Sequence, residues 1–468
     1  MRRVADLPGP RAWPLVGNLL QLRATRIHQD VERWCRLYGP LFRFTIGRTP
    51  VLVVADHKLV AAILRDRPDG FRRPAVTARV SEELGGAPGL FLAEGTEWRD
   101  QRRMVMAGFA PTAIKAYFPA LLAVAQRLQR RWEAAAQAGR AIELTDDLKR
   151  YTVDIIAGLA FGTEVNTIDG GEDIVQRHLD IIMAGVARRS FSPIPYWRHV
   201  RLPVDRRLER SVAALHSAIE TLIATARARM AHAPARREQA NNLLEAMISA
   251  AGQGGSGVDD RAVAGNVSTM LLAGEDTTAN TLAWMLYLLQ RHPESMRRAQ
   301  DEVRRIAPDP AAFTIHQMDA LDYLDACVQE TMRLKPVAPF MPLEALRATT
   351  VADVLLPQGG MVWCVLRHDS VDEAHVPNAA RFAPERWLED GAAGAGKGIG
   401  TPFGAGARTC PGRYLALLEI KVAMAMLLAR FAIASIDTPH GKEAVEWMAF
   451  VMSPAGLRMR LRAHQDIA

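Results

Sequence analysis

The stretch 260–291 constrains the fold most, because it predicts one helix long enough to cross an entire domain. Asp259 and Asp260 supply a helix-start signal, and Pro293 follows Arg291 where the pattern ends. About 33 residues at ~1.5 Å each give a rod of roughly 50 Å. The rest of a chain built on such a rod has to pack around it.

The centre of this predicted helix has a composition that helix interiors usually avoid. Residues 273–278 read Ala-Gly-Glu-Asp-Thr-Thr. Gly274 costs about 1 kcal/mol relative to alanine, and threonine hydroxyls can bond back to preceding carbonyls and bend the axis. We therefore expect a local bulge or groove, which by itself would be a kink without chemistry.

The stretch 403–412, Phe-Gly-Ala-Gly-Ala-Arg-Thr-Cys-Pro-Gly, surrounds a single cysteine with glycine. Glycine lets the backbone come very close to a flat or bulky ligand. A thiolate at Cys410 would be favoured at the start of the apolar run 414–434, where free amides and the helix dipole stabilise negative charge. Pro411 has no N–H, so hydrogen bonds to the sulfur have to come from residues further on. The simpler alternative is a buried structural cysteine.

The full pattern Phe403-x-x-Gly406-x-Arg408-x-Cys410-x-Gly412 resembles the haem-binding signature of the cytochromes P450, the haem-thiolate monooxygenases. The resemblance implies that Cys410 is the axial ligand of the iron of haem b, and that Arg408 pairs with a haem propionate. A thiolate ligand pushes electron density onto iron and favours O–O bond cleavage. The residues of this loop that we expect at the haem are Phe403, Gly404, Arg408, Cys410 and Gly412.

The unusual centre of the long helix resembles the oxygen-binding groove of the same family. The resemblance implies that Asp276 relays protons and that Thr277 holds dioxygen and a water molecule. It also places Ala273 and Gly274 against the haem. General acid function requires a protonatable group that is linked to solvent.

Two further arginines are candidates for the haem propionates. Trp98 and Arg102 are four residues apart and share one face of a helix. Alone, the pair would be an ordinary arginine lying along an aromatic ring, but it resembles the Trp-x-x-x-Arg of the family, which binds a propionate. Arg347 could also reach a propionate, although its spacing from Pro339 departs somewhat from the family pattern.

Glu330 and Arg333 form an acid–base pair three residues apart. Such a pair is commonplace and is normally worth about 0.2–0.5 kcal/mol. Its position after the long helix resembles the buried ion pair of the family, which Arg386 would complete. A half-satisfied buried charge is costly, so loss of any member should abolish folding or haem retention.

The resemblance covers nearly the whole chain and implies a mainly α-helical, triangular fold as one domain over 1–468. A smaller β-rich part would comprise approximately 38–75 and 337–388. The stretch 355–366 reads as strand, turn, strand, and 447–461 as a closing hairpin that turns at 454–456. The other predicted helices are 28–38, 113–135, 144–161, 172–189 and 204–231.

Composition bounds the compartment and the partners. Four cysteines in 468 residues do not form a disulfide framework, which fits a reducing compartment. The N-terminal region lacks the ~20 apolar residues of a spanning helix, so we expect a cytoplasmic protein without a membrane anchor, similar to bacterial members of the family. The net charge of +7 contains no arginine tract that resembles a nucleic-acid arm.

The basic charge has two readings, a solvated surface or a docking face for an acidic electron donor. The resemblance favours a ferredoxin or flavodoxin as a separate partner that passes electrons from NAD(P)H. The candidate docking residues are Arg99, Arg103, Arg413 and Lys421.

The resemblance implies a monomeric haem-dependent monooxygenase that inserts one oxygen atom of O2 into a small hydrophobic substrate of fatty acid, terpenoid or steroid type. The alternatives are a peroxide-driven peroxygenase and a non-catalytic haem sensor, and the acid–alcohol pair Asp276-Thr277 argues against both. The residues that family position places in the substrate pocket are nearly all apolar: Val186, Leu272, Ala273, Val337, Phe340, Val451 and Met452.

Overall fold

The computed structural model describes residues 1–463 except 171–173, 191, 193, 239, 254–255 and 389–397. The predicted start of the helix 172–189 and most of the glycine-rich stretch 391–400 lie outside the described residues.

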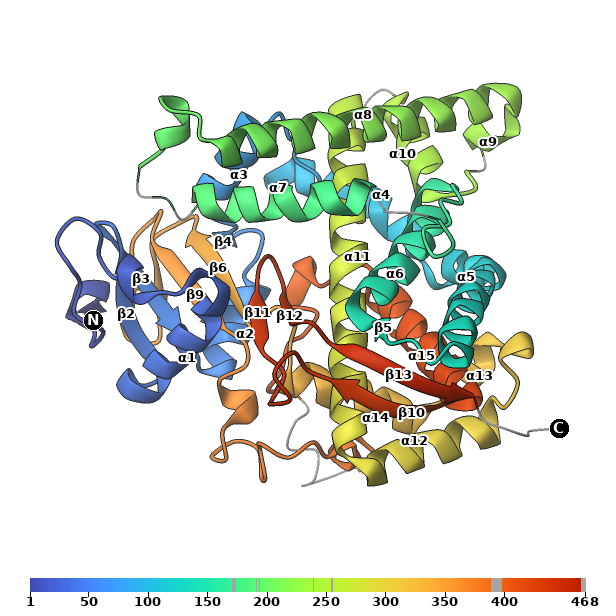
Figure 1. The fold of residues 1–468 in the computed structure, drawn as a ribbon. Helices are drawn as coiled ribbons and strands as arrows, with labels where there is room; N and C mark the ends of the chain where they lie inside the picture. The colour runs from blue at the N-terminus through green and yellow to red at the C-terminus, as the bar shows by residue number, and fades with distance from the viewer. Residues whose placement is uncertain are drawn as a thin grey trace.

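The predicted long helix is present as α11, Asp260–Arg291, and it crosses the molecule from one edge to the other (Figure 1). The Asp259 carboxylate caps its start by accepting a hydrogen bond from the Ala262 amide at 2.7 Å. The helices that pack along it include α6 (Leu144–Phe161), α14 (Asp322–Leu334) and α15 (Arg413–Arg430). Helix α5 (Pro111–Gln137) packs on α6 and α15.

The remaining helices cover the outside of this assembly. Helices α7 (Ile174–Ser190) and α8 (Pro203–His232) lie together across one end, at the top of Figure 1. The others are α1 (Ile27–Tyr38), α2 (His57–Arg65), α3 (Ala75–Glu83), α4 (Gly95–Gly108), α9 (Ala235–Glu238), α10 (Leu243–Ala251), α12 (Pro293–Ile306) and α13 (Ile315–Asp319).

A five-stranded sheet with the order β2-β3-β9-β6-β4 forms the β-rich part, at the left of Figure 1. Its strands are β2 (Leu41–Ile46), β3 (Thr49–Val54), β9 (Met361–Val365), β6 (Phe340–Ala345) and β4 (Phe71–Arg72). A second sheet joins β1 (Arg2–Arg3), β8 (Val354–Leu356) and β7 (Thr349–Val351).

The two strands predicted within 355–366 are present, but they do not pair with each other. Strand β8 lies between β1 and β7, whereas β9 lies between β3 and β6 in the larger sheet. Four of the five β9 residues are buried, which is the burial expected of a central strand. The stretch therefore links two sheets instead of forming a hairpin.

The C-terminal hairpin turns earlier than the sequence predicted. Strands β11 (Glu446–Met448) and β12 (Met452–Pro454) pair around residues 449–451. Gly456 has a φ of +62°, and this bend carries the chain out of the hairpin instead of closing it. The chain then enters a third sheet, with the order β10 (Phe431–Asp437), β13 (Arg458–Ala463) and β5 (Ile142–Glu143).

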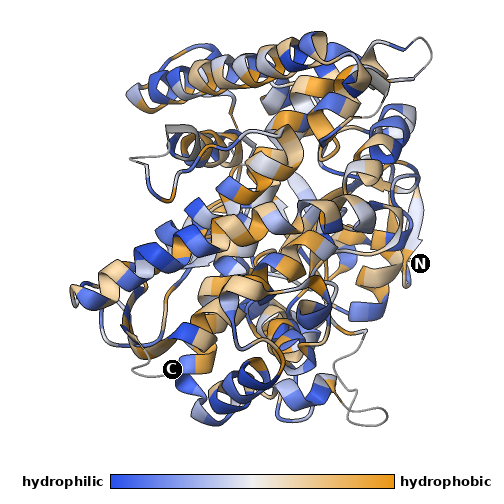
Figure 2. Ribbon diagram, turned by 90° about the vertical axis from the view of Figure 1, so that its right-hand side faces the viewer, coloured by the Kyte–Doolittle hydropathy of each residue, from blue (hydrophilic) through white to orange (hydrophobic). Residues whose placement is uncertain are grey.

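Hydrophobic residues form one large buried cluster among the helices and a smaller one in the β-rich part. Figure 2 shows hydrophobic segments concentrated on the inner helices and hydrophilic ones along the outer helices. Among the described residues, no single helix is both long and apolar enough to cross a membrane. The bent pair α4 and α5, which meet at 51°, passes that test by length and composition.

The structure brings together Glu330 and Arg333, both on α14, and Arg386 from the turn 384–387. The Arg333 guanidinium contacts both Glu330 oxygens at 2.8 Å, and Arg386 Nε lies 3.1 Å from Glu330 Oε1. The other N–H groups of Arg333 donate to the carbonyl oxygens of Ser370, Ala379 and Arg381. Burial opposes ionisation of Glu330, but the hydrogen bonds and charge of Arg333, with hydrogen bonds from the Ala383 amide and Trp387 Nε1, outweigh it and lower the pKa of the carboxyl.

A second buried network was not predicted. Arg367 binds Glu32 at 2.7 and 2.8 Å and Glu446 at 2.7 and 3.0 Å. His28 and Lys335 also contact Glu446, at 2.9 and 2.6 Å. This network ties α1 to β11 and to the loop after β9.

Candidate active site

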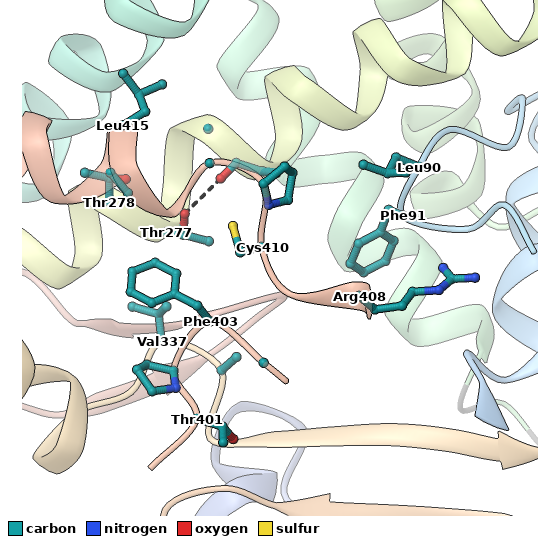
Figure 3. A pocket seen from close by; sticks show the side chains of 18 of the residues that line it. Leu90, Phe91, Thr277, Thr278, Val337, Thr401, Phe403, Arg408, Cys410 and Leu415 are labelled. Atoms are coloured by element: carbon teal, nitrogen blue, oxygen red, sulfur yellow. Dashed lines mark hydrogen bonds between the residues drawn. The ribbon is translucent and has the colours of Figure 1, made fainter. Parts of the chain in front are cut away.

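The loop around Cys410 forms one wall of a cavity of about 310 Å³, and the middle of α11 forms the opposite wall. The Cys410 amide donates to the Phe403 carbonyl oxygen at 2.9 Å, which folds the loop back on itself. Figure 3 shows the sulfur pointing into the cavity, on the side where Thr277 and Phe403 lie. Helix α15 begins at Arg413, so the cysteine lies just before the helix start, as predicted.

Glycine is required in this loop for two separate reasons. Gly404 and Gly406 have φ angles of +75° and +71°, which side chains other than glycine rarely adopt. A Cβ on Gly406 would lie 2.7 Å from the Cα of Arg65, at the end of α2. The loop therefore packs directly on α2.

The Cys410 side chain is exposed to the cavity, and protein surrounds it on the other sides. This burial raises the pKa of the thiol, while a hydrogen bond from the Gly412 amide and the charge of Arg102 oppose the rise. The amide donor comes from beyond Pro411, as the sequence required. Binding of a metal ion here would displace the thiol proton, because the thiolate is the ligating form.

The wall opposite the cysteine is the unusual segment of α11. Thr277 Oγ1 donates to the Ala273 carbonyl oxygen at 2.8 Å, which is the back-bonding expected of a threonine in a helix. A Cβ on Gly274 would lie 2.7 Å from Ile156 Cγ1 of α6. Glycine at this position therefore lets α6 pack closely against α11, and the helix stays α-helical throughout.

Asp276 does not line the cavity. Its Oδ1 lies 2.7 Å from Lys149 Nζ on α6, and the same ammonium lies 3.4 Å from Asp180 of α7. Burial lowers the pKa of Lys149, but the charges of Asp276 and Asp180 outweigh it and raise that pKa. The acid predicted as a proton relay is thus an ion-pair partner at the back of α11, because consecutive helical residues point in different directions.

The structure brings most of the predicted haem contacts to one cavity and leaves most of the predicted substrate contacts outside it. The predicted residues that line the cavity are Trp98, Arg102, Ala273, Gly274, Thr277, Val337, Phe403, Gly404, Arg408, Cys410 and Gly412. Those that do not are Asp276, Arg347, Val186, Leu272, Phe340, Val451 and Met452.

Two of the predicted substrate residues outside the cavity, Phe340 and Met452, have other packing roles. The Phe340 ring stacks on Trp363 at 4.9 Å, inside the β-rich part. The Met452 amide donates to the Val337 carbonyl oxygen at 2.8 Å, so β12 supports the cavity wall from behind. The apolar lining that sequence reasoning missed includes Leu90, Phe91, Phe109, Ile156, Met270 and Met341. Leu90 and Phe91 lie on the segment that connects α3 to α4.

Arg347 was a candidate for the cofactor and is not at the cavity. Its Nη2 lies 2.9 Å from both carboxylate oxygens of Asp66, and its Nη1 donates to the Asp69 carbonyl oxygen at 2.9 Å. The guanidinium is thus engaged on the outer surface by the turn that follows α2.

Four arginines surround one end of the cavity, two of which the sequence did not single out. Arg67 and Arg73 join the predicted Arg102 and Arg408 in the lining. Arg408 Nη2 donates to the Ala93 carbonyl oxygen at 2.8 Å and to the Glu94 carboxylate, and its guanidinium lies over the Trp98 ring at 4.5 Å. Arg102 Nη2 donates to the Thr409 carbonyl oxygen at 2.6 Å.

These four cations lack enough negative charge around them. Burial lowers the pKa of every one, to about 10 for Arg408. The charge of Glu94 only partly compensates for Arg67, Arg73 and Arg408, and Cys410 does the same for Arg102. The Nε atoms of Arg67 and Arg408 are buried without a hydrogen-bond partner among the described residues. A flat ligand with two carboxylates at one edge would supply the missing acceptors and charge.

Glu419 of α15 also lines the cavity and was not predicted. Its side chain is buried, and burial raises the pKa of the carboxyl well above its ordinary value, against a hydrogen bond from Thr278. The group is therefore a neutral acid at one edge of the cavity. It could have been suspected from the sequence alone as a single acid within the apolar run 414–434.

A cysteine and a threonine-bearing helix face each other across a mainly apolar cavity with surplus cations at one end, an arrangement that fits an anionic cofactor held by a thiolate. The comparisons agree with this geometry. The family model described as cytochrome P450 matches residues 7–461. The chain belongs to the cytochrome P450 family, whose members bind haem b and act as monooxygenases.

The solved structure of the cytochrome P450DA haem domain is 25% identical and covers 99% of both chains, with a TM-score of 0.84. A self-sufficient cytochrome P450 monooxygenase of Aspergillus niger is 27% identical over 98% of this chain. Cytochrome P450 714D1 of Oryza sativa subsp. japonica is 29% identical and covers 94% of this chain and 78% of the relative. The chain spans 42% of the length of the Aspergillus relative.

Proposed function

We propose that this chain inserts one oxygen atom of O2 into a hydrophobic substrate bound between α11 and the Cys410 loop. The observation that carries the proposal is the opposition of Cys410 and Thr277 across a mainly apolar cavity with surplus cations at one end. The lining offers Leu90, Phe91 and Met270 to a substrate, which favours an apolar molecule of fatty acid, terpenoid or steroid type.

The residues present fit haem. Cys410 would supply the thiolate ligand, and Arg102 and Arg408, with Arg67 and Arg73, would neutralise the propionates. When bound, the haem supplies the activation of dioxygen, which protein side chains cannot perform. The apolar lining excludes bulk water and orients the substrate.

Thr277 is placed to handle a proton at the opposite wall. Its hydroxyl has lone pairs that can accept a hydrogen bond from water in the cavity while it donates to Ala273. Rotation of Oγ1 away from the Ala273 carbonyl would turn its proton toward the cavity. Lys149, Asp276 and Asp180 form a charged row behind α11, and the side chain of Asp180 is 56% exposed, so this row connects the helix to solvent.

The electron donor docks, in our proposal, near the Cys410 loop, where Arg103 and Arg413 are exposed. Arg99 is paired with Asp69 at 2.7 Å, and Lys421 lies 3.6 Å from Asp325 with 12% of its side chain exposed. Lys421 is therefore removed from the predicted docking set. Several relatives are named self-sufficient, so they give no support to a separate ferredoxin or flavodoxin.

The test has two stages. Hydrophobic compounds are first screened for a spin-state shift in the haem absorption spectrum of the purified protein. Each binder is then incubated with NADPH and a surrogate reductase or ferredoxin, or with hydrogen peroxide alone. Oxygenated product with the electron donor supports the proposal, product with peroxide alone identifies a peroxygenase, and no product with either contradicts it.

The variant Thr277→Ala tests the role of the hydroxyl. Loss of Oγ1 should divert reducing equivalents from product to hydrogen peroxide, because the proton and water at this wall are no longer positioned. The measurement is the ratio of product and peroxide formed to NADPH consumed. An unchanged ratio would remove Thr277 from the mechanism.

A further inference from the structure

Away from the cavity, three histidines converge on one buried carboxylate. His57 is the first residue of α2, whereas His368, Asp369 and His375 lie on the loop after β9. Asp369 Oδ2 lies 2.8 Å from His57 Nδ1 and 3.6 Å from His375 Nε2, and Oδ1 lies 2.9 Å from His368 Nδ1. The rings of His57 and His375 meet edge to face, with centroids 5.2 Å apart.

We propose that His57, Asp369 and His375 bind a borderline divalent transition-metal ion, for which Zn²⁺ is the probe. The candidate ligand atoms of the three residues all lie within 4.8 Å of one another. Zinc bonds of ~2.0–2.1 Å in a tetrahedron place neighbouring ligands about 3.3 Å apart. The distances from Asp369 Oδ2 to His57 Nδ1 and His375 Nε2, 2.8 and 3.6 Å, bracket that separation. Small side-chain rotations therefore suffice to coordinate the ion.

Neighbouring groups fix the orientation of the Asp369 carboxylate. Its Oδ2 accepts the His57 backbone N–H at 2.8 Å, and Oδ1 faces His368. His368 thus acts as the outer partner that orients a ligating carboxylate. The side chain of His375 is 36% exposed, which gives the ion a path from solvent.

The donor set decides the class of ion. Two imidazoles and one carboxylate suit zinc, nickel, cobalt or copper, whereas magnesium and calcium prefer oxygen ligands. The bound ion would tie the start of α2 to the loop after β9. Because the end of α2 packs on Gly406, the site would secure the helix that supports the Cys410 loop. This role does not depend on the proposed substrate.

The experiment uses haem-loaded protein without a histidine tag, stripped with a chelator and titrated with Zn²⁺. We expect one tightly bound equivalent and a higher thermal midpoint with the metal. X-ray absorption at the zinc edge should show nitrogen and oxygen neighbours at about 2.0–2.1 Å and no sulfur at about 2.3 Å. A sulfur shell would place the zinc at a cysteine and overturn the proposal.

The variant His375→Ala should bind zinc at least tenfold more weakly and should lose the metal-dependent rise in the thermal midpoint. His375 is exposed, so this change spares the core. The matched control is His440→Ala, an exposed histidine outside the cluster, which should bind like the parent protein. Equal zinc binding by the His375 and His440 variants, or no stoichiometric binding by the parent, would show that the cluster is a hydrogen-bonded cap without a metal.

Discussion

Two buried groups of arginines in this molecule differ in how well the protein satisfies them. Arg333 has an acceptor for each of its N–H groups, among them both oxygens of the ionised Glu330. Arg67 and Arg408 at the cavity keep a buried Nε without a described partner, and burial lowers the pKa of both groups. The protein completes the first group by itself, whereas the second is complete only with an anionic ligand. The first therefore serves the fold and the second serves the cofactor.

The largest loss of stability should come from a substitution in the group formed by Glu330, Arg333 and Arg386. Glu330→Ala leaves Arg333 and Arg386 buried without their carboxylate, and loss of one partner of a buried pair costs about 3–5 kcal/mol. Denaturant unfolding of the purified variant measures this loss, and failure to accumulate folded protein is the extreme form of the same result.

A matched control is Asp301→Ala, which removes the partner of Arg304 in an exposed pair at 3.5 Å on α12. Exposed pairs are worth about 0–1 kcal/mol. Equal losses for the two variants would contradict the view that the Glu330 group is a special structural element.

A substitution among the cavity arginines should weaken haem binding more than it lowers the stability of the fold. Arg408→Ala removes one cation that would face a propionate, and we expect haem transfer to apomyoglobin to become at least tenfold faster. The far-UV circular dichroism should not change. Arg347→Ala is the control, because its guanidinium is held by Asp66 away from the cavity, and its rate of haem loss should equal that of the parent. If Arg347→Ala lost haem faster than Arg408→Ala, Arg347 and not Arg408 would be the arginine that binds a propionate.

The smallest effect is expected at Glu419, a buried carboxyl that, unlike Glu330, has no basic side chain among the described residues to hold it ionised. The pKa of Glu419 lies above its unfolded value of 4.5, so folding binds a proton above that pH and stability falls as pH rises toward the folded pKa. Glu419→Gln removes this dependence. The unfolding free energy of the variant minus that of the parent should therefore increase between about pH 5 and pH 8. Denaturant unfolding across this range is the measurement, and parallel curves would refute a raised pKa.

The sequence predicted those parts of the site that local pattern encodes. The cysteine loop and the Gly-x-x-Thr segment each carry unusual residues at fixed spacing, so Cys410 and Thr277 were found. The long helix was predicted from its cap and its terminating proline. Glu330 and Arg333 share one helix and were expected to pair.

The rest depends on tertiary structure that local pattern does not contain. Arg67 and Arg73 lie on either side of β4, and nothing near them in the sequence indicates that both reach the cavity. Asp276 was assigned by its position beside Thr277, but it points away from the cavity, and its ion-pair partner Lys149 lies on another helix. The strand partners of β8 and β9 were missed for the same reason, since pairing over long sequence distances leaves no local signal.

The central claim is that Cys410 presents a thiolate to haem iron beneath α11. The most direct measurement is the absorption spectrum of the reduced, carbon monoxide-bound protein, compared with that of the Cys410→Ser variant. We expect a strongly red-shifted Soret band in the parent protein and loss of that band in the variant. A parent spectrum without the red shift, or a variant that keeps it, would contradict the account.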